Sequence, residues 1–421
     1  MYKMFKSVMK DGGIFVNTYK EMNNESIVEY IKELEIFPKD HKLVSSEIGD
    51  GNLNYVFRIK DQDTNKTVVV KQALPYLKIA GDGWKLTLDR NRIEAEAMKC
   101  QNDVCPGSVP KVFYHDNDYA LTVMEDLGDM SILRRGLMDM KRYPNFPKQI
   151  GKFMARNLFL TSDLGMGPME KKMNMSKFIS PELCDITERL VLTNPYMDAE
   201  DNSINQYIKD FVVSEIWNCN DLRVETAKLK SIFMTKAESL LHGDLHTGSI
   251  FIDDEKSVVF DTEFAFYGPY GYDIGLLFAN IILNYVSWEG RMDKSQEEVD
   301  DYRQYLLDLC SEIWDEFLKD FDYLWENKSK DVITKIQGYK ENYIYDLLHE
   351  TVGFCACEVM RRIIGMAHVP DLDEIEDLKE RGKAQILGLK IAKKLILCRN
   401  DINGFEDFIE AIALTSKQVC I

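Results

Sequence analysis

The first third of the chain alternates short β-rich runs with polar turns. The runs NYVFRIK and TVVVKQAL flank the polar stretch DQDTNK and predict a β-hairpin. A second hairpin is predicted over residues 111–127, KVFYHDNDYALTVMEDL, with its turn at residues 115–118. Between the two hairpins, residues 89–101 have a helical composition with acidic residues near the start. The pattern predicts antiparallel strands accompanied by one helix.

Beyond about residue 128 the hydrophobic period changes to that of helices. Apolar residues recur at helical spacing in residues 148–164, 203–217, 226–241, 301–321, 343–368 and 383–400. One β-like stretch, SIFIDDEKSVVFD at residues 249–261, interrupts them. The apolar run IGLLFANIIL, residues 274–283, is interrupted by Asn280 and indicates a buried helix. We therefore predict a β-rich N-lobe over residues 1–126 and a helical C-lobe over residues 127–421, joined so closely that both face one cleft.

Composition narrows the functional classes. The chain of 421 residues carries a net charge of −18, so we expect no nucleic-acid partner. No stretch reaches the ~18 apolar residues of a membrane span, and we expect no membrane partner. The nine cysteines are scattered, odd in number and form no CxxC pair, which favours a reducing, cytoplasmic environment over disulfides or a zinc ribbon.

Two features of the N-lobe point to phosphate binding. The sequence GDGN, Gly49 to Asn52, lies between extended runs, and successive backbone N–H groups of such a turn can cradle phosphate. Lys71 ends the run VVV on the next strand, where its ammonium group can hold nucleotide phosphates. Glu94 and Glu96 could each pair with Lys71 from the following helix, and we favour Glu94 because Ala97 and Met98 are then its packing neighbours.

A connector and two acidic motifs complete the predicted site. Backbone groups of Glu125, Asp126 and Leu127 are candidates for binding an adenine ring. In HGDLHTGSI, Asp244 could accept the proton of an attacking hydroxyl, as catalytic aspartates of kinases do. After the β-like stretch comes DTE, and in an extended segment Asp261 and Glu263 would face the same way and reach one metal cluster.

These motifs, in this order, resemble the protein-kinase-like fold of small-molecule phosphotransferases such as aminoglycoside and choline kinases. The longer motifs HGDLHTGSI, DTEFAFYGPYGYDIG, LTLDRNRIEAEA and GDGNLNYVF resemble the 5-methylthioribose kinase family over nearly the whole chain. The resemblance implies an α+β, two-lobed fold and, in most members, a homodimer. It implies ATP-dependent phosphorylation of the 1-hydroxyl of 5-methylthioribose, with Mg²⁺, in methionine salvage.

The resemblance also implies roles for individual residues. Asp244 matches the catalytic base, Asp261 and Glu263 match the metal ligands, and Lys71 matches the phosphate-binding lysine. Arg361 and Arg362 resemble paired arginines near the sugar and the transferred phosphate. The loop that would cover the phosphates contains Gly49, Asp50, Gly51, Asn52 and Asn54.

Some positions depart from the protein-kinase pattern or have simpler interpretations. Ser249 stands where protein kinases place a metal-binding asparagine, so Glu263 would supply that ligand. Gly243 replaces an arginine whose bulk would narrow the cleft. Arg361 and Arg362 point about 100° apart on a helix, so one of them could make only a surface ion pair. His242 and His246 are expected to be structural rather than substrate-binding.

Two other functions compete with this one. A kinase of choline, an aminoglycoside or another sugar would use the same chemistry, although two arginines disfavour a cationic acceptor. A nucleotide-binding module without catalysis would have lost the base or a metal carboxylate. Because Lys71, Asp244, Asp261 and Glu263 are all present, the sequence favours an active kinase.

Overall fold

The chain forms two compact units. The computed structural model describes residues 19–48, 53–77, 81–291 and 294–419. The first unit contains residues 1–95 and 112–126, and the second contains residues 96–111 and 127–421. Helix α2 (Asp89–Val104) contributes its first turns to the first unit and the remainder to the second.

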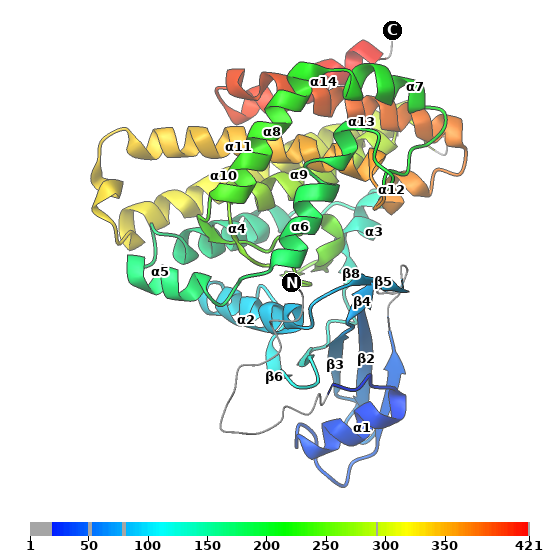
Figure 1. The fold of residues 1–421 in the computed structure, drawn as a ribbon, viewed down its shortest axis with the longest axis vertical. Helices are drawn as coiled ribbons and strands as arrows, with labels where there is room; N and C mark the ends of the chain where they lie inside the picture. The colour runs from blue at the N-terminus through cyan, green and yellow to red at the C-terminus, as the bar shows by residue number, and fades with distance from the viewer. Residues whose placement is uncertain (1–18, 49–52, 78–80, 292–293, 420–421) are drawn as a thin grey trace. The chain divides into compact units, whose positions relative to one another are not determined.

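The first unit is built on an antiparallel five-stranded sheet, drawn in blue and cyan in Figure 1. The strands, in spatial order, are β1 (Leu43–Glu47), β2 (Asn54–Asp61), β3 (Thr67–Ala73), β7 (Leu121–Glu125) and β6 (Val112–Asp116). Both predicted hairpins are present as β2–β3 and β6–β7. A further pair of short strands, β4 (Tyr76–Leu77) and β5 (Gly81–Lys85), was not predicted.

Helix α1 (Asn24–Glu33) covers part of this sheet and was also not predicted from the sequence. Its N-terminus is closed by Asn23, whose side chain accepts hydrogen bonds from the backbone of Glu25 and Ser26. Ile27 and Ile31, one turn apart, are fully buried against the sheet. Alternate residues of the strands meet them there, including Phe57, Ile59, Val68, Val70, Leu121 and Val123.

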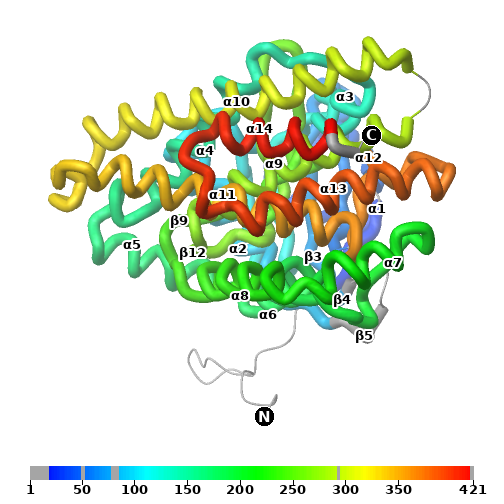
Figure 2. Tube along the Cα trace, turned by 90° about the horizontal axis from the view of Figure 1, so that it is seen from above, coloured from blue at the N-terminus to red at the C-terminus, as the bar shows by residue number. Residues whose placement is uncertain are grey.

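The second unit is mostly helical, as predicted (Figure 2). Its longer helices are α4 (Phe146–Thr161), α8 (Asn220–Thr235), α9 (Tyr270–Ser287), α10 (Gln296–Lys328), α11 (Tyr339–Ile364), α13 (Leu378–Cys398) and α14 (Phe405–Val419). The shorter ones are α3 (Leu133–Met138), α5 (Pro168–Met175), α6 (Pro181–Leu190), α7 (Lys209–Phe211) and α12 (Pro370–Asp373).

Helix α9 lies at the centre of the second unit. All of its residues are buried, which confirms the buried helix predicted from the apolar run. Helix α11 packs against α9 along its length, and Gly275 lets the two backbones approach, because a Cβ there would lie 2.7 Å from the amide nitrogen of Cys355. None of the helices in the described residues is both long and apolar enough to cross a membrane.

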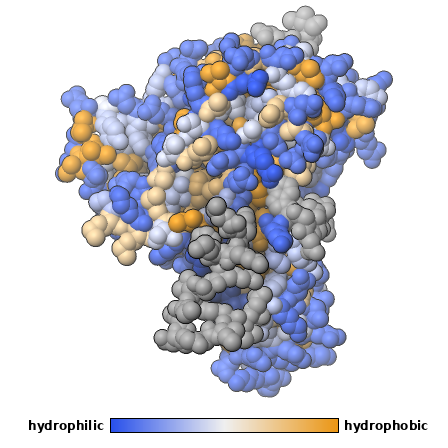
Figure 3. Space-filling model, viewed as in Figure 1, coloured by the Kyte–Doolittle hydropathy of each residue, from blue (hydrophilic) through white to orange (hydrophobic). Residues whose placement is uncertain are grey.

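The β-like stretch between the helices is a small antiparallel sheet. Strands β10 (Ile250–Ile252) and β11 (Ser257–Val259) form the predicted hairpin, and β8 (Ser131–Ile132) pairs with β10 on its other side. The predicted α+β class is thus confirmed. On the face drawn in Figure 3, hydrophilic residues predominate and apolar ones occur in small groups.

We expect the stability of the first unit to depend on the apolar contacts between α1 and the sheet. Phe57 is 1% exposed within this core, whereas Phe113, on β6, is 46% exposed. Phe57→Ala should lower the free energy of unfolding by about 3–5 kcal/mol, because it leaves a cavity. Phe113→Ala, the matched control, should change it by about 0.5 kcal/mol or less. Urea unfolding of both variants measures the difference, and equal losses would contradict this account of the core.

Candidate active site

The motif HGDLHTGS forms a tight loop between β9 (Ser239–Leu240) and β10. Gly243 has φ = +84°, and a Cβ there would lie 2.2 Å from the carbonyl oxygen of Phe264. Both facts exclude a larger side chain at this position. The glycine is therefore required by the local backbone, a more immediate reason than the width of a cleft.

The buried carboxylate of Asp273 holds the backbone of this loop through two hydrogen bonds. The Asp273 side chain, in the first turn of α9, accepts hydrogen bonds from the backbone nitrogens of His242 at 2.6 Å and Gly243 at 3.0 Å. Burial raises the pKa of Asp273, although the His242 and Gly243 groups favour its ionised form. The start of α9 and the HGDLHTGS loop are thus joined through one side chain.

The His242 side chain braces the loop, as the sequence predicted. Its Nδ1 accepts a hydrogen bond from the backbone nitrogen of Asp244 at 3.2 Å, and its Nε2 lies 2.9 Å from the carbonyl oxygen of Phe260. Because Nδ1 is an acceptor, Nε2 must carry the proton that is donated to Phe260. His242 is fully buried, so it serves the loop rather than a substrate.

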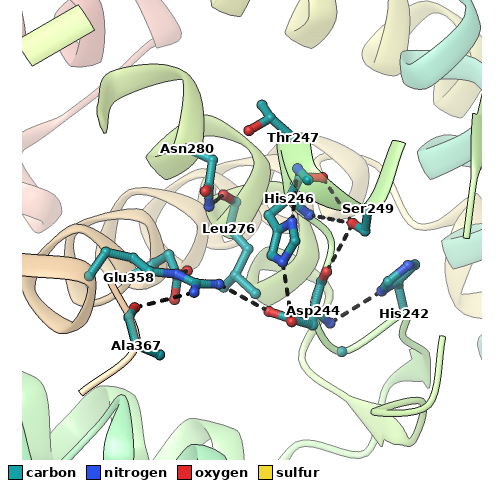
Figure 4. Close-up of polar contacts among 12 residues, drawn as sticks. His242, Asp244, His246, Thr247, Ser249, Leu276, Asn280, Glu358 and Ala367 are labelled. Atoms are coloured by element: carbon teal, nitrogen blue, oxygen red, sulfur yellow. Dashed lines mark hydrogen bonds and ion pairs between the residues drawn. The ribbon is translucent and has the colours of Figure 1, made fainter. Parts of the chain in front are cut away.

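Ser249 is also occupied within the loop. Its hydroxyl lies 3.1 Å from the carbonyl oxygen of Asp244 and 2.9 Å from that of His246, and it accepts a hydrogen bond from the His246 nitrogen at 3.0 Å (Figure 4). The side chain is 2% exposed. A hydroxyl used in this way closes the turn, and the prediction that Glu263 replaces it as a metal ligand stays a prediction.

Two guanidinium groups and one imidazole surround the carboxylate of Asp244. Its Oδ1 is 3.4 Å from Nη2 of Arg361 and 3.6 Å from Nη2 of Arg362, and its Oδ2 is 3.3 Å from Nε2 of His246. About 28% of the Asp244 side chain remains exposed. The structure therefore brings together all three residues predicted to act on the substrate.

Both arginines turn toward Asp244 because a third residue on α11 holds them. Glu358 is fully buried, and it accepts a hydrogen bond from Nε of Arg361 at 2.7 Å and from Nε of Arg362 at 2.6 Å. The spacings of three and four residues place both arginines on the Glu358 side of the helix. The expectation that one arginine makes only a surface ion pair is wrong.

The charges around Asp244 determine its protonation. Burial would raise the pKa of Asp244, but His246 first, and then Arg362 and Arg361, outweigh burial and hold it well below its usual range. Asp244 is therefore a carboxylate at neutral pH. It can accept a hydrogen bond from a hydroxyl group. Because its pKa is low, Asp244 is a weak base, and it would take the proton only from a hydroxyl that has become acidic.

Asp261 and Glu263 belong to a segment that is hydrogen-bonded to the HGDLHTGS loop. The backbone nitrogen of Phe260 donates to the carbonyl oxygen of Ser249 at 3.0 Å, directly before Asp261. The sequence predicted an extended segment here, and that prediction is wrong. Asp261 has φ = +69°, and a turn follows at Glu263. The two carboxylates are thus positioned by a turn rather than by strand alternation.

In the first unit, the structure decides between the two candidate partners of Lys71. Nζ of Lys71, on β3, lies 2.8 Å from Oε1 of Glu94, on α2, and both side chains are buried. Glu96 instead pairs with Lys99 on the exposed side of α2. The choice of Glu94 is confirmed, and this ion pair holds the ammonium group in one place.

The remaining predicted nucleotide contacts are only partly described. Gly49, Asp50, Gly51 and Asn52 lie outside the described residues. Asn54 begins β2, and its Oδ1 lies 3.4 Å from Arg90. Asp126 forms a two-fold hydrogen-bonded ion pair with Arg58. Glu125 ends β7, while the carbonyl oxygen of Leu127 accepts a hydrogen bond from Met130.

Comparison with known proteins decides the family. The phosphotransferase enzyme family matches residues 45–317. The chain is 43% identical to the methylthioribose kinase of Geobacillus sp. (strain WCH70) over 397 residues, which cover 94% of this chain and 96% of that protein. The chain belongs to the methylthioribose kinase family. The methylthioribose kinases of Geobacillus kaustophilus (43% identity, covering 95% of this chain and 98% of that protein) and Bacillus velezensis (40%, with the same coverages) are similar to it as well.

The structure of this member of the methylthioribose kinase family adds site residues that sequence reasoning missed. Asp273 stood in the motif GYDIG without an assigned role, and Glu358 precedes the two arginines at helical spacing, so both had a signal in the sequence. Arg134, on α3, had none. Its Nη2 donates to Asn280 at 2.6 Å and its Nε lies 3.2 Å from the Thr247 hydroxyl, so it reaches the catalytic loop from a distant part of the chain.

We expect Gly243→Ala to damage the loop through two separate effects. A left-handed backbone costs an alanine about 1–2 kcal/mol, and the new Cβ would also overlap Phe264. Gly107→Ala is the matched control, because Gly107 has φ = +80° but no atom within 4 Å of its Cβ position. Thermal unfolding should show a larger loss for the Gly243 variant. Equal losses would mean that the contact with Phe264 is unimportant.

Proposed function

We propose that this protein is an ATP-dependent kinase that phosphorylates the 1-hydroxyl of 5-methylthioribose and yields 5-methylthioribose 1-phosphate. The observation that supports this most is the convergence of Arg361 and Arg362 on the carboxylate of Asp244. A carboxylate suits an attacking hydroxyl, and guanidinium groups suit a phosphoryl group that carries negative charge. Its relatives are named methylthioribose kinases, which supports the sugar as the acceptor.

Asp244 would orient the 1-hydroxyl and take its proton. Because its pKa is held low, it orients the hydroxyl by accepting a hydrogen bond and receives the proton as the new O–P bond forms and the hydroxyl oxygen loses electron density. Arg361 and Arg362 would then stabilise the charge on the phosphoryl oxygens. Their Nε atoms are held by Glu358, so little reorganisation is needed during the reaction.

The donor groups fit the nucleotide and the metal ion that a kinase requires. Asp261 and Glu263 offer carboxylate oxygens, the ligands that Mg²⁺ prefers, on a segment bonded to the catalytic loop. When bound, Mg²⁺ would neutralise negative charge on the phosphates of ATP. Lys71, fixed by Glu94, would hold phosphate oxygens, and Glu125 to Leu127 would offer backbone groups to the adenine.

The setting of the reaction is also part of the proposal. A chain that makes 5-methylthioribose 1-phosphate would act in methionine salvage, in the cytoplasm, and the family resemblance favours a homodimer. The eight cysteines in the described residues are free thiols, which supports a reducing compartment. Sedimentation of the purified protein would test the dimer independently of activity.

Product analysis tests the function directly. The protein should convert ATP and 5-methylthioribose, with Mg²⁺, into ADP and a 1-phosphate that ³¹P NMR identifies. Ribose, choline and kanamycin should react much more slowly. Turnover of one of these acceptors alone would replace the proposed substrate and keep the phosphotransfer. No turnover of any, with measurable ATP binding, would favour a non-catalytic module.

In the same assay, Asp244→Asn should lower kcat by about 10²- to 10⁴-fold, since the hydroxyl would lose its proton acceptor. ATP binding, measured by calorimetry, should persist. Asp254→Asn, an exposed aspartate in the β10–β11 turn, is the control and should behave as the wild type. A fully active Asp244→Asn variant would remove this residue from the mechanism.

Glu263 should chiefly affect the metal requirement. Glu263→Gln removes a charged oxygen at a site that is 3% exposed, so the Mg²⁺ concentration for half-maximal activity should rise about 10-fold or more. Glu255→Gln, on the exposed β10–β11 turn, should leave the Mg²⁺ titration unchanged. Identical titrations for the two variants would exclude Glu263 as a ligand.

A further inference from the structure

His246 lies directly beside the reacting carboxylate but has no role in the function proposed above. Its Nε2 is 3.3 Å from Oδ2 of Asp244 (Figure 4), whereas the two arginines approach Oδ1. The imidazole is largely covered, with 16% of the side chain exposed. A histidine with only a packing role would need no contact with this oxygen.

The other ring nitrogen determines which atom carries the proton. Nδ1 of His246 accepts a hydrogen bond from the backbone nitrogen of Gly248 at 3.0 Å, so it has no proton of its own. Nε2 must then carry the proton, and this N–H group lies 3.3 Å from Oδ2 of Asp244. Burial lowers the pKa of His246 against the pull of Asp244, which keeps the ring neutral near pH 7.

The turn that holds His246 is itself anchored. Thr247 is 1% exposed, and its hydroxyl lies 3.2 Å from Nε of Arg134. Arg134 also bonds Asn280 on α9 and lies 3.3 Å from Oδ2 of Asp371 on α12. Three helices therefore fix the turn, and the turn fixes the direction of the Nε2–H group.

We propose that His246 is a positioning residue, whose neutral Nε2–H group holds Oδ2 of Asp244 and sets the plane of the carboxylate for the acceptor hydroxyl. This inference rests on the proposed kinase function. In a transfer that depends on alignment, a carboxylate free to rotate would spend less time in the reactive orientation. The arginines alone do not set the plane, because both approach Oδ1.

His246 also affects the pH range in which Asp244 is ionised. The charged and titratable groups that face Asp244 come from the loop, α3, α9 and α11, and are His246, Arg134, Tyr272, Asp273, Glu358, Arg361 and Arg362. The Nε2–H group of His246 favours the ionised carboxylate, and at acid pH, where the ring itself becomes protonated, its charge makes His246 the group that does most to lower the pKa of Asp244. Losing its N–H would raise that pKa, so the fall of kcat on the acid side would begin at a higher pH.

Two substitutions separate positioning from turn closure. His246→Gln places an amide N–H as many bonds from the backbone as Nε2, and so keeps a donor to Asp244 while losing the acceptor for Gly248. His246→Asn keeps an acceptor for Gly248, where asparagine is a favourable cap, and loses the donor to Asp244. A positioning role predicts that the Gln variant is the more active, and a purely structural role predicts the Asn variant.

With the acceptor that the wild type phosphorylates, His246→Asn should lower kcat by about 10- to 100-fold, leave the KM for ATP unchanged and move the acid limb of kcat to higher pH. His246→Gln should keep most of kcat and the wild-type pH profile. His41→Leu, which removes another histidine–aspartate pair from the first unit, is the control and should retain both. Higher activity in the Asn variant than in the Gln variant would overturn the proposal.

A measurement without turnover keeps this test separate from the test of the kinase function. ¹⁵N NMR of the histidine-labelled protein should show His246 as the neutral Nε2–H form at pH 7, and Asp244→Ala should shift its Nε2 resonance. The chain has six histidines, and the spectrum of His246→Gln identifies this one by its absence. A charged ring or an Nδ1–H form would overturn the proposal even if no acceptor is found.

Discussion

The candidate site depends on the buried hydrogen bonds between Asp273 and the backbone of His242 and Gly243. A backbone N–H that is buried without a partner is costly, so the loop keeps its tight bend only while this carboxylate is in place. The bend makes φ positive at Gly243 and directs Asp244 toward α11. One aspartate at the start of the central helix thus determines where the carboxylate of Asp244 lies.

The arrangement around Asp244 also depends on a balance between positive and negative side chains. Two arginines beside one partly exposed aspartate would leave an excess of positive charge in a largely buried region. Glu358, on the same helix α11, offsets that charge. The fully buried Glu358 has a pKa that burial would raise and that Arg361 and Arg362 lower. The result is a cluster of ionised side chains, which in the proposed function would receive a negatively charged phosphoryl group.

The proposed roles divide along these contacts. The arginines approach one carboxylate oxygen of Asp244, and the imidazole of His246 approaches the other. Orientation of the acceptor and stabilisation of the phosphoryl charge would therefore depend on different residues. Arg134 is coupled to both sides of Asp244. Its Nε hydrogen-bonds Thr247, the residue after His246, and the positive charge of Arg362 adds to burial in lowering the pKa of Arg134 to about 10.

The sequence by itself determined the local features of this protein. The β-hairpins, most helices and the pairing of Lys71 with Glu94 follow from short-range patterns, because strand alternation and helical spacing act over a few residues. The chemical roles of Asp244, Asp261 and Glu263 were read from motifs and stay predictions. Only the tertiary structure decided that both arginines contact Asp244, that the backbone of Asp261 is left-handed, and that Arg134 reaches the loop. Those outcomes depend on contacts between segments far apart in the chain. The pattern of hydrophobic and polar residues along one sequence contains no information about such contacts.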